Sequence, residues 1–285
     1  MQTIDGKALA ERLCHGLRDR ISAFTTGQGR APGLAVVIVG ADPASQVYVA
    51  MKERKAKSLG IRSFRHEFGT EISEDDLIAL VDRLNANPEI DGILVQLPLP
   101  GHVDAGRVLD RISPAKDVDG FHPVNVGRLS IGTDGLVPCT PLGVMKLLET
   151  VVTDFRGLNA VVIGKSNIVG KPVALLLLER ECTVTVTHIE TRGLHGIVSG
   201  ADIVVVAAGS PGLVRGDWVK PGAVVIDVGI TRMADGTIRG DVAYDDLDPS
   251  VAAATPVPGG VGPMTIACLM LNTVQAAERR NSLSD

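Results

Sequence analysis

Short apolar runs alternate with longer amphipathic stretches along almost the whole chain, and this alternation limits the fold more than any other feature. Each run has six to eight residues, is dominated by Val, Ile, Leu and Ala, and ends near a Gly or a Pro. The clearest examples are residues 34–40, 92–97, 159–164, 202–209 and 223–229. Buried strands that alternate with helices form βαβ units and parallel sheets covered on both faces. We therefore expect an α/β protein.

The runs fall into two series, one before residue 100 and one after residue 157. Between them, residues 117–141 are rich in Pro, Gly and Asp and show little periodicity. The length of 285 residues is enough for two modest domains. We expect the domain junction in this stretch, with a helix over about 141–152 crossing between the domains and an amphipathic helix ending the chain.

The composition excludes several classes of function. The chain carries 28 Lys and Arg against 33 Asp and Glu, a formal charge of −5, whereas a nucleic-acid-binding surface needs a basic excess. No apolar run reaches the ~18 residues of a membrane span. The first twenty residues lack the apolar core of a signal peptide. We expect a soluble, cytoplasmic protein without nucleic-acid or membrane partners.

The cysteines and acidic residues do not indicate a metal site. The four cysteines are Cys14, Cys139, Cys182 and Cys268. They lie far apart and form no CxxC pair, so they resemble small buried apolar side chains more than zinc ligands or a disulfide framework. Asp117 and Asp119 share a loop that could serve a metal, a substrate or a turn. No His or second carboxylate cluster accompanies them, so no metal is expected.

The second series opens with a strand, the turn 164–170 (GKSNIVG) and a helix. A turn of this kind presents backbone N–H groups to a pyrophosphate at the helix N-terminus. Its GxSxxxG pattern departs from the usual GxGxxG, and an ordinary strand-to-helix turn remains an alternative. Glycine-rich turns at 207–212 and 227–230 follow two further apolar strands. They favour a dinucleotide site, because ligands bind at the carboxyl ends of parallel strands.

In the first series, the helix that follows Asp42 and Pro43 carries Tyr48 and Lys52 four residues apart. A rotation of 100° per residue places Lys52 on the apolar side of this helix. Burial lowers the pKa of a lysine, which suits proton transfer near neutral pH. The alternative is that Lys52 extends its ammonium group to solvent beside the neighbouring basic residues.

Two further segments are candidates for a ligand site. Gln96 places a polar amide at the carboxyl end of the strand 92–97, although a plain turn would show the same pattern. Residues 256–263 contain three prolines and three glycines immediately before the last helix. Prolines and glycines in this density fix one unusual backbone path, which is typical of a ligand-facing loop rather than of a soft linker.

Six strings of residues together resemble one family of enzymes. They are YVAMK (48–52), ILVQLPLP (93–100), KDVDGFHPVNVGRL (116–129), PCTPLG (138–143), GKSNIVGKP (164–172) and PGGVGPMT (258–265). In this order they resemble the bifunctional methylenetetrahydrofolate dehydrogenase/methenyltetrahydrofolate cyclohydrolases. The resemblance covers essentially the whole chain, and ILVQLPLP and PGGVGPMT are its most specific strings.

The resemblance implies two α/β domains with an active cleft between them. Residues 1–140, completed by the C-terminal helix 264–285, would form the folate-binding catalytic domain, and residues 141–263 a Rossmann-type domain that binds NADP. A homodimer through the nucleotide domain is also implied. Enzymes of this family oxidise 5,10-methylenetetrahydrofolate with NADP+ and then hydrolyse the methenyl product to 10-formyltetrahydrofolate, in one-carbon metabolism and purine biosynthesis.

The resemblance also implies roles for individual residues. Tyr48 matches the tyrosine that stacks against folate, and Lys52 matches the catalytic lysine. Gln96 and Asp119 match the amide and the carboxylate that contact the lysine and the pterin. The positions that match cofactor contacts are Gly164, Lys165, Ser166 and Ile230. The loop expected to face the substrate contains Pro258, Gly259 and Gly260.

The residues that would select the cofactor do not all favour the same one of NAD and NADP. Glu190 lies 20 residues after Gly170, where an acid that accepts the ribose 2′-OH favours NAD. Lys165 and Arg192 could instead bind a 2′-phosphate. Ile189, where the family usually has a polar or basic residue, adds no hydrogen bond. We expect NADP, with Lys165 as the main phosphate ligand.

Three other functions remain open at this level. An ordinary nicotinamide-dependent hydroxy-acid dehydrogenase would share the second series, but the general acid and the Arg clamp that it usually needs are not evident. A non-catalytic nucleotide-sensing module would have no reason to place Tyr48 and Lys52 as they stand. A monofunctional member of the same family is less favoured, because Lys52, Gln96 and Asp119 are all present.

Overall fold

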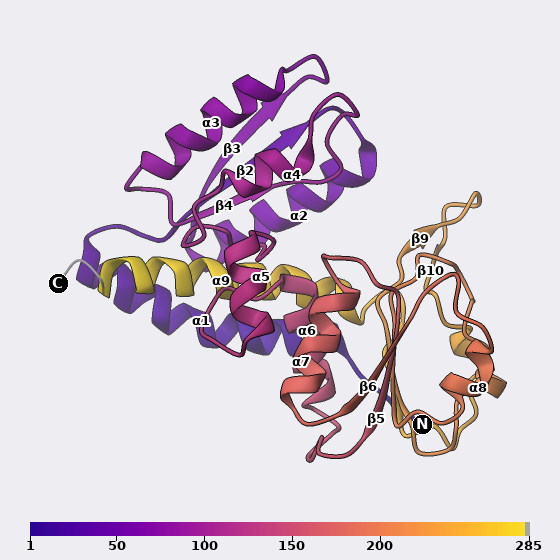
Figure 1. The fold of residues 1–285 in the computed structure, drawn as a ribbon. Helices are drawn as coiled ribbons and strands as arrows, with labels where there is room; N and C mark the ends of the chain where they lie inside the picture. Colours follow the sequence, from indigo (N-terminus) through magenta and orange to yellow (C-terminus); the bar gives the residue numbers. More distant parts are fainter. Residues whose placement is uncertain (283–285) are drawn as a thin grey trace. The chain divides into compact units, whose positions relative to one another are not determined.

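The structure, a computed structural model, describes residues 1–282 (Figure 1). The chain divides into two compact units. The first unit contains Arg12–Cys139 and the segment from Ile266 onward, and the second contains Met1–Glu11 and Thr140–Thr265. This division differs from the one expected from sequence at the N-terminus, because the first eleven residues group with the second unit.

A three-stranded parallel sheet in the order β3-β2-β4 forms the centre of the first unit. Its strands are β2 (Gly33–Val39), β3 (Arg62–Phe68) and β4 (Gly92–Val95). Its helices are α2 (Pro43–Leu59), α3 (Glu74–Ala86), α4 (Ala105–Asp110) and α5 (Pro123–Ser130). Three helices have residues in both units, namely α1 (Gly6–Gln28), α6 (Cys139–Leu148) and α9 (Val261–Ser282). Every residue of β2 is buried, which confirms the strand predicted from the apolar run 34–40.

Local sequence signals set the ends of α2 and α3. The Asp42 carboxylate accepts a backbone N–H of the first turn of α2, and Pro43 occupies that turn. Gly60 ends α2 in the left-handed conformation, with φ of 86°. At α3, the Ser73 hydroxyl accepts the N–H of Asp76 and donates to its carboxylate, so Ser73 caps the start of the helix. The apolar side of α3 packs against Ala35, Val37 and Val39 of β2.

The second unit is built on a six-stranded sheet in the order β1-β11-β8-β7-β5-β6, whose strand pairs are all parallel. Its strands are β1 (Gln2–Thr3), β5 (Asn159–Ile163), β6 (Thr183–Thr187), β7 (Ile203–Val206), β8 (Val224–Asp227) and β11 (Ala253–Ala254). An antiparallel hairpin is formed by β9 (Thr231–Arg232) and β10 (Ile238–Arg239). The helical segments are α7 (Gly170–Glu179), α8 (Leu194–Val198) and the 3₁₀ turns Gly216–Trp218 and Tyr244–Asp246.

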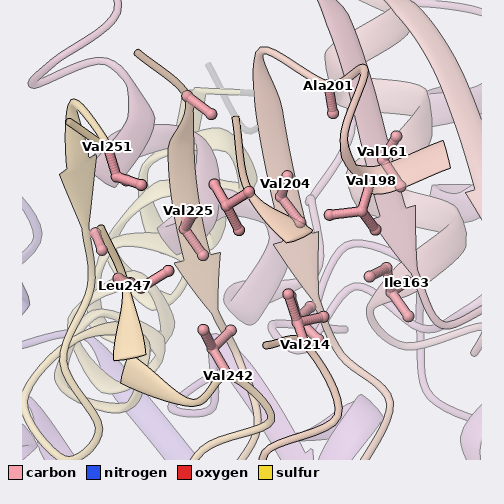
Figure 2. Close-up of a cluster of buried hydrophobic side chains, with 14 residues drawn as sticks. Val161, Ile163, Val198, Ala201, Val204, Val214, Val225, Val242, Leu247 and Val251 are labelled. Atoms are coloured by element: carbon pink, nitrogen blue, oxygen red, sulfur yellow. The ribbon is translucent and has the colours of Figure 1, made fainter. Parts of the chain in front are cut away.

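Valines from neighbouring strands fill the core on one face of this sheet (Figure 2). Val161, Val204 and Val225 belong to β5, β7 and β8, and they pack with Val198 of α8. Helix α7 covers the other face (Figure 1). Because these strands are parallel, their carboxyl ends lie along one edge of the sheet, where the glycine-rich turns predicted from sequence are found.

The N-terminal residues extend this sheet. Gln2 lies opposite Ala253 in the β1-β11 pair, and the N–H of Ile4 donates to the carbonyl of Ala254 at 2.8 Å. Nothing in the local pattern of the first residues predicts this pairing, because its partner lies about 250 residues further along the chain. In the described part of the chain, no helix has the length and the hydropathy that a bilayer crossing requires.

Candidate active site

Lys52 lies on the buried side of α2, where its side chain is 4% exposed. Its Nζ donates a hydrogen bond of 3.0 Å to Oε1 of Gln96. The same Nζ lies 4.6 Å from the centroid of the Tyr48 ring, within cation–π range. The alternative in which Lys52 extends into solvent is therefore wrong. Helix geometry places Tyr48 and Lys52 on adjacent turns of one face, and the sheet supplies the amide.

Gln96 is held in a defined orientation immediately after β4. Its backbone N–H donates to the carbonyl of Val37 at 2.8 Å, which continues the β2-β4 ladder by one residue. Its side-chain Nε2 donates to the carbonyl of Leu97 at 2.7 Å, so the amide oxygen faces Lys52. Both ends of the amide are thus used. The structure brings Gln96 to Lys52 across 44 residues of sequence.

The loop after Lys116 is organised by the carboxylate of Asp117. This carboxylate accepts the backbone N–H groups of Gly120, Phe121 and His122 and the side-chain amide of Asn125. Donors of this kind occupy both of its oxygens, so Asp117 builds the turn that presents the next carboxylate. Of the three uses left open for this pair of aspartates, the turn is the one that Asp117 fulfils.

Asp119 is electrostatically coupled to Lys52. Burial raises the pKa of its carboxyl group, the Lys52 charge lowers that pKa, and the nearby Asp117 charge raises it. Burial also raises the pKa of Cys139 well above its usual value, so the thiol stays protonated and can donate. The first unit thus places the Lys52 ammonium beside an amide and a phenol ring, with the carboxyl group of Asp119 close enough to interact with it electrostatically.

Two residues of this neighbourhood were missed by sequence reasoning. Cys139 is buried, as expected, but its thiol also lies 3.2 Å from the carbonyl of Val118. Asn272, on α9, donates from Nδ2 to the carbonyls of Val118 and Val137, each at 2.8 Å. It therefore holds the backbone next to Asp119. The local signal that could have identified Asn272 is a pair of polar residues, Asn272 and Thr273, within a largely apolar helix.

The turn after β5 can follow its backbone path only because of its glycines. Gly164 has φ of 118°, and a Cβ there would lie 2.2 Å from the carbonyl oxygen of Ala207. A Cβ at Gly170 would lie 2.0 Å from the carbonyl oxygen of Gly164. The helix N-terminus is thus packed directly against the strand end, as a phosphate-binding turn requires. This observation favours the dinucleotide interpretation over an ordinary turn.

The other expected cofactor residues lie on the same edge of the sheet. The Ser166 hydroxyl accepts the N–H groups of Val169 and Gly170 at 3.2 and 3.3 Å and so shapes the first turn of α7. Lys165 is exposed and makes no ion pair with any residue that the structure describes. Ile230 is 59% exposed in the turn that follows β8.

The residues expected to select the cofactor are all exposed. Ile189 is 96% exposed in the turn after β6, and both Glu190 and Arg192 face solvent beside it. The N–H of Glu190 donates to Nδ1 of His188 at 3.3 Å, while its carboxylate lies at the surface. Because Glu190 is solvated, it can turn away from a phosphate without a large desolvation cost.

The proline- and glycine-rich segment packs against the start of α1. The N–H of Lys7 donates to the carbonyl of Gly259 at 3.0 Å. A Cβ at Gly6 would lie 1.8 Å from the carbonyl oxygen of Gly260, and a Cβ at Gly260 would lie 2.7 Å from Thr255. This loop is therefore built into the second unit rather than being a soft linker.

Comparison with known proteins gives two family matches. Residues 4–119 match the family "Tetrahydrofolate dehydrogenase/cyclohydrolase, catalytic domain", and residues 138–281 match the family "Tetrahydrofolate dehydrogenase/cyclohydrolase, NAD(P)-binding domain". Bifunctional protein FolD 1 of Rhizorhabdus wittichii is 66% identical over 281 residues, covering 97% of this chain and 95% of the relative. Bifunctional protein FolD of Methylorubrum extorquens is 55% identical, with coverage of 97% and 92%.

Solved structures agree over the full length. The bifunctional FolD enzyme of Campylobacter jejuni superimposes with a TM-score of 0.96 at 46% identity, covering 98% of this chain and 99% of that one. The Trypanosoma brucei methylenetetrahydrofolate dehydrogenase-cyclohydrolase, which was solved with NADP and an inhibitor, gives a TM-score of 0.94 at 41% identity, covering 98% of each chain.

Proposed function

Because the chain belongs to the tetrahydrofolate dehydrogenase/cyclohydrolase family, we propose that it catalyses two consecutive reactions on one folate. It oxidises 5,10-methylenetetrahydrofolate to the methenyl form with NADP+, and it hydrolyses the methenyl form to 10-formyltetrahydrofolate. The hydrogen bond from the buried Lys52 to Gln96 is the observation that supports the second reaction, the hydrolysis.

Lys52 is the proton carrier of the hydrolysis. The methenyl carbon is an electrophilic, amidinium-like centre, so the attacking water must lose a proton and a folate nitrogen must gain one. An amine held away from solvent by α2 and oriented by Gln96 can do both. Tyr48 supplies a flat aromatic surface for the folate ring beside this amine, and Asp119 supplies a carboxyl group that binds the pterin.

The oxidation needs alignment more than acid–base chemistry. NADP+ supplies the acceptor for the hydride that leaves the folate carbon. Gly164 and Ser166 shape the turn that binds its pyrophosphate, and Lys165 offers an unpaired ammonium to the 2′-phosphate. Ile230 contacts the nucleotide at the end of β8. The loop of Pro258, Gly259 and Gly260 faces the substrate.

We expect NADP+ to be preferred over NAD+ in kcat/KM, and Lys165 to be responsible. Replacing Lys165 with Ala removes a charge-assisted phosphate contact, so kcat/KM for NADP+ should fall by about ten- to a hundredfold. The value for NAD+ should change little. Initial rates with each cofactor measure both numbers.

Lys171→Ala is the matched control, because the Lys171 ammonium already binds the side chain of Asn167 at 2.7 Å. This variant should keep the preference for NADP+. A wild-type preference for NAD+ by tenfold, about 1.4 kcal/mol, would contradict the expected preference for NADP+.

The second unit also supports a homodimer. Strand β6 is the outermost strand of the sheet, so its outer backbone groups have no strand partner there. Its Val186 is 40% exposed, and Leu178 of the preceding helix α7 is 59% exposed. An exposed edge with apolar side chains is suited to pairing with the same edge of a second copy around a two-fold axis.

We expect sedimentation velocity to give a molecular mass of about twice the 29.8 kDa of one chain. Val186→Glu places a charge on the exposed edge and should convert the protein to monomers, whereas Ile131→Glu, at an exposed apolar residue of the first unit, should not. Sedimentation velocity distinguishes the two. A wild type that stays monomeric at micromolar concentration would rule out this assembly.

We place the reaction in the cytoplasm. All four cysteines, Cys14, Cys139, Cys182 and Cys268, are buried in the described part of the chain. Their wide spacing in the sequence does not resemble the disulfide framework of a secreted protein.

A further inference from the structure

Two buried carboxyl groups of the second unit have no role in the reactions described above. Asp227 is the last residue of β8 and is 2% exposed, and Asp241 follows β10 and is fully buried. They are neighbours, because the backbone N–H of Asp241 donates to Oδ1 of Asp227 at 3.0 Å. Two acidic side chains buried together are costly, so a fold retains them only for a reason.

Asp241 holds the loop that follows β7. Its Oδ2 accepts the backbone N–H groups of Ala208 and Gly209, at 2.7 and 2.8 Å. The residue before them, Ala207, is the one against which the Gly164 turn packs so closely that no Cβ fits. Asp241 therefore supports, through one loop, the turn that binds the pyrophosphate.

Asp227 holds the loop that follows β8. Its carboxylate accepts the N–H groups of Gly229 and Val242, both at 2.9 Å. A Cβ at Gly229 would lie 2.4 Å from Oδ1 of Asp241, so this loop lies directly on the second carboxyl group as well. The next residue is Ile230. The pair thus fixes both loops at the carboxyl edge of the sheet, where a parallel sheet binds its ligand.

One carboxylate oxygen of Asp227 and Asp241 is not used by the backbone contacts described above. Oδ1 of Asp241 is buried and has no hydrogen-bond partner among the residues that the structure describes. An asparagine at this position could offer one oxygen to the same two N–H groups, so the backbone contacts alone do not require a carboxylate. Burial also raises the pKa of Asp227 to about 6, which leaves this group ionised at pH 8.

We propose that Asp241 is a positioning residue for the nicotinamide nucleotide. Together with Asp227 it fixes residues 207–209 and 228–230, and it gives this edge of the sheet a negative charge. The oxidised nicotinamide ring is positively charged and the reduced ring is neutral. The carboxyl pair therefore favours NADP+ over NADPH, in the direction of the oxidation. This inference rests on the proposed function.

The test is the affinity of Asp241→Asn for each form of the cofactor at pH 8, measured by calorimetry without folate. Loss of one buried charge should raise the Kd for NADP+ by about tenfold and that for NADPH by less than about threefold. Hydrolysis of methenyltetrahydrofolate should stay within about twofold of wild type, because Lys52 and Gln96 belong to the first unit. Asp245→Asn is the control, since Asp245 is exposed on the same segment.

If Asp241→Asn weakens the binding of NADP+ and NADPH equally, the role of Asp241 is merely structural and the inference is overturned. Unchanged affinity for both forms would also overturn it. If Asp241→Asn is not recovered folded, Asp227→Asn neutralises the partner carboxyl and should give the same difference between the two forms. A wild type that binds neither nucleotide would contradict the proposed function itself.

Discussion

Replacing Lys52 with Met is expected to abolish the cyclohydrolase reaction while folate still binds. Met keeps the unbranched stem that packs on α2 and removes the amine that Gln96 orients. A positioned acid–base group contributes about 10²- to 10⁴-fold to a rate, and the loss should be of this size. The dehydrogenase reaction should fall less, because hydride transfer depends on the alignment of the two rings.

Both activities should be measured on one preparation, with hydrolysis of methenyltetrahydrofolate followed separately from reduction of NADP+. Lys57→Met is the control, because Lys57 is exposed on the same helix. It should leave both rates close to wild type. Hydrolysis by Lys52→Met at the wild-type rate would show that another group carries the proton.

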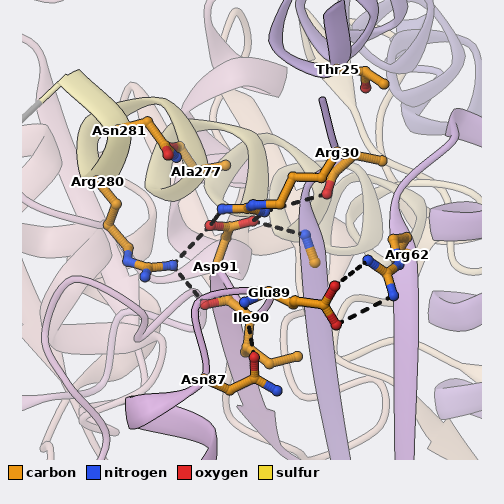
Figure 3. A network of polar contacts seen from close by, with 12 residues as sticks. Thr25, Arg30, Arg62, Asn87, Glu89, Ile90, Asp91, Ala277, Arg280 and Asn281 are labelled. Carbon is orange, nitrogen blue, oxygen red and sulfur yellow. Dashed lines mark hydrogen bonds and ion pairs between the residues drawn. The ribbon is translucent and has the colours of Figure 1, made fainter. Parts of the chain in front are cut away.

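Replacing Asp91 with Ala is expected to cause the largest loss of stability in the first unit. Asp91 is fully buried and binds two arginines and a backbone N–H (Figure 3). Arg30 donates to both of its oxygens at 2.6 and 2.9 Å, Arg280 donates at 2.8 Å, and the N–H of Gly33 donates at 2.9 Å. Alanine would leave two guanidinium groups without their shared anion, at a cost of about 3–5 kcal/mol.

Urea denaturation followed by circular dichroism measures the free energy of unfolding. Glu89→Ala is the matched control, because Glu89 binds Arg62 at the surface and an exposed pair contributes about 0–1 kcal/mol. If the two variants lose the same free energy, the Asp91 network does not hold this unit together.

Much of the fold follows from local sequence. The apolar runs became strands because their side chains are buried on both faces of a parallel sheet, as β2 shows. Asp42, Pro43 and Ser73 set the helix starts because caps act over three or four residues. The position of Lys52 on the apolar side of α2 also follows from the helical repeat alone. The family matches bear out the two-domain α/β fold and the folate function, and the hydroxy-acid alternative is wrong.

The pairing of polar groups depends on contacts between distant segments. Gln96 became a partner of Lys52, and Asn272 reached the backbone beside Asp119, because the sheet and α9 brought these residues together. The roles of Tyr48, Lys52, Gln96 and Asp119 in the reaction stay predictions for the experiments above.

Sequence by itself therefore determined the main buried strands, the helix that carries Lys52 and the side on which these elements bury their apolar residues, because periodicity and capping act over a few neighbouring residues. It did not predict α5, which forms within the stretch 117–141 that shows little periodicity. Only the tertiary structure decided where β1 pairs, which donors surround Asp91, and that Asp227 and Asp241 share one site. A buried polar atom needs a hydrogen-bond partner, but no periodic pattern in the sequence indicates which residue that partner is. It is fixed only when the strands and helices have packed.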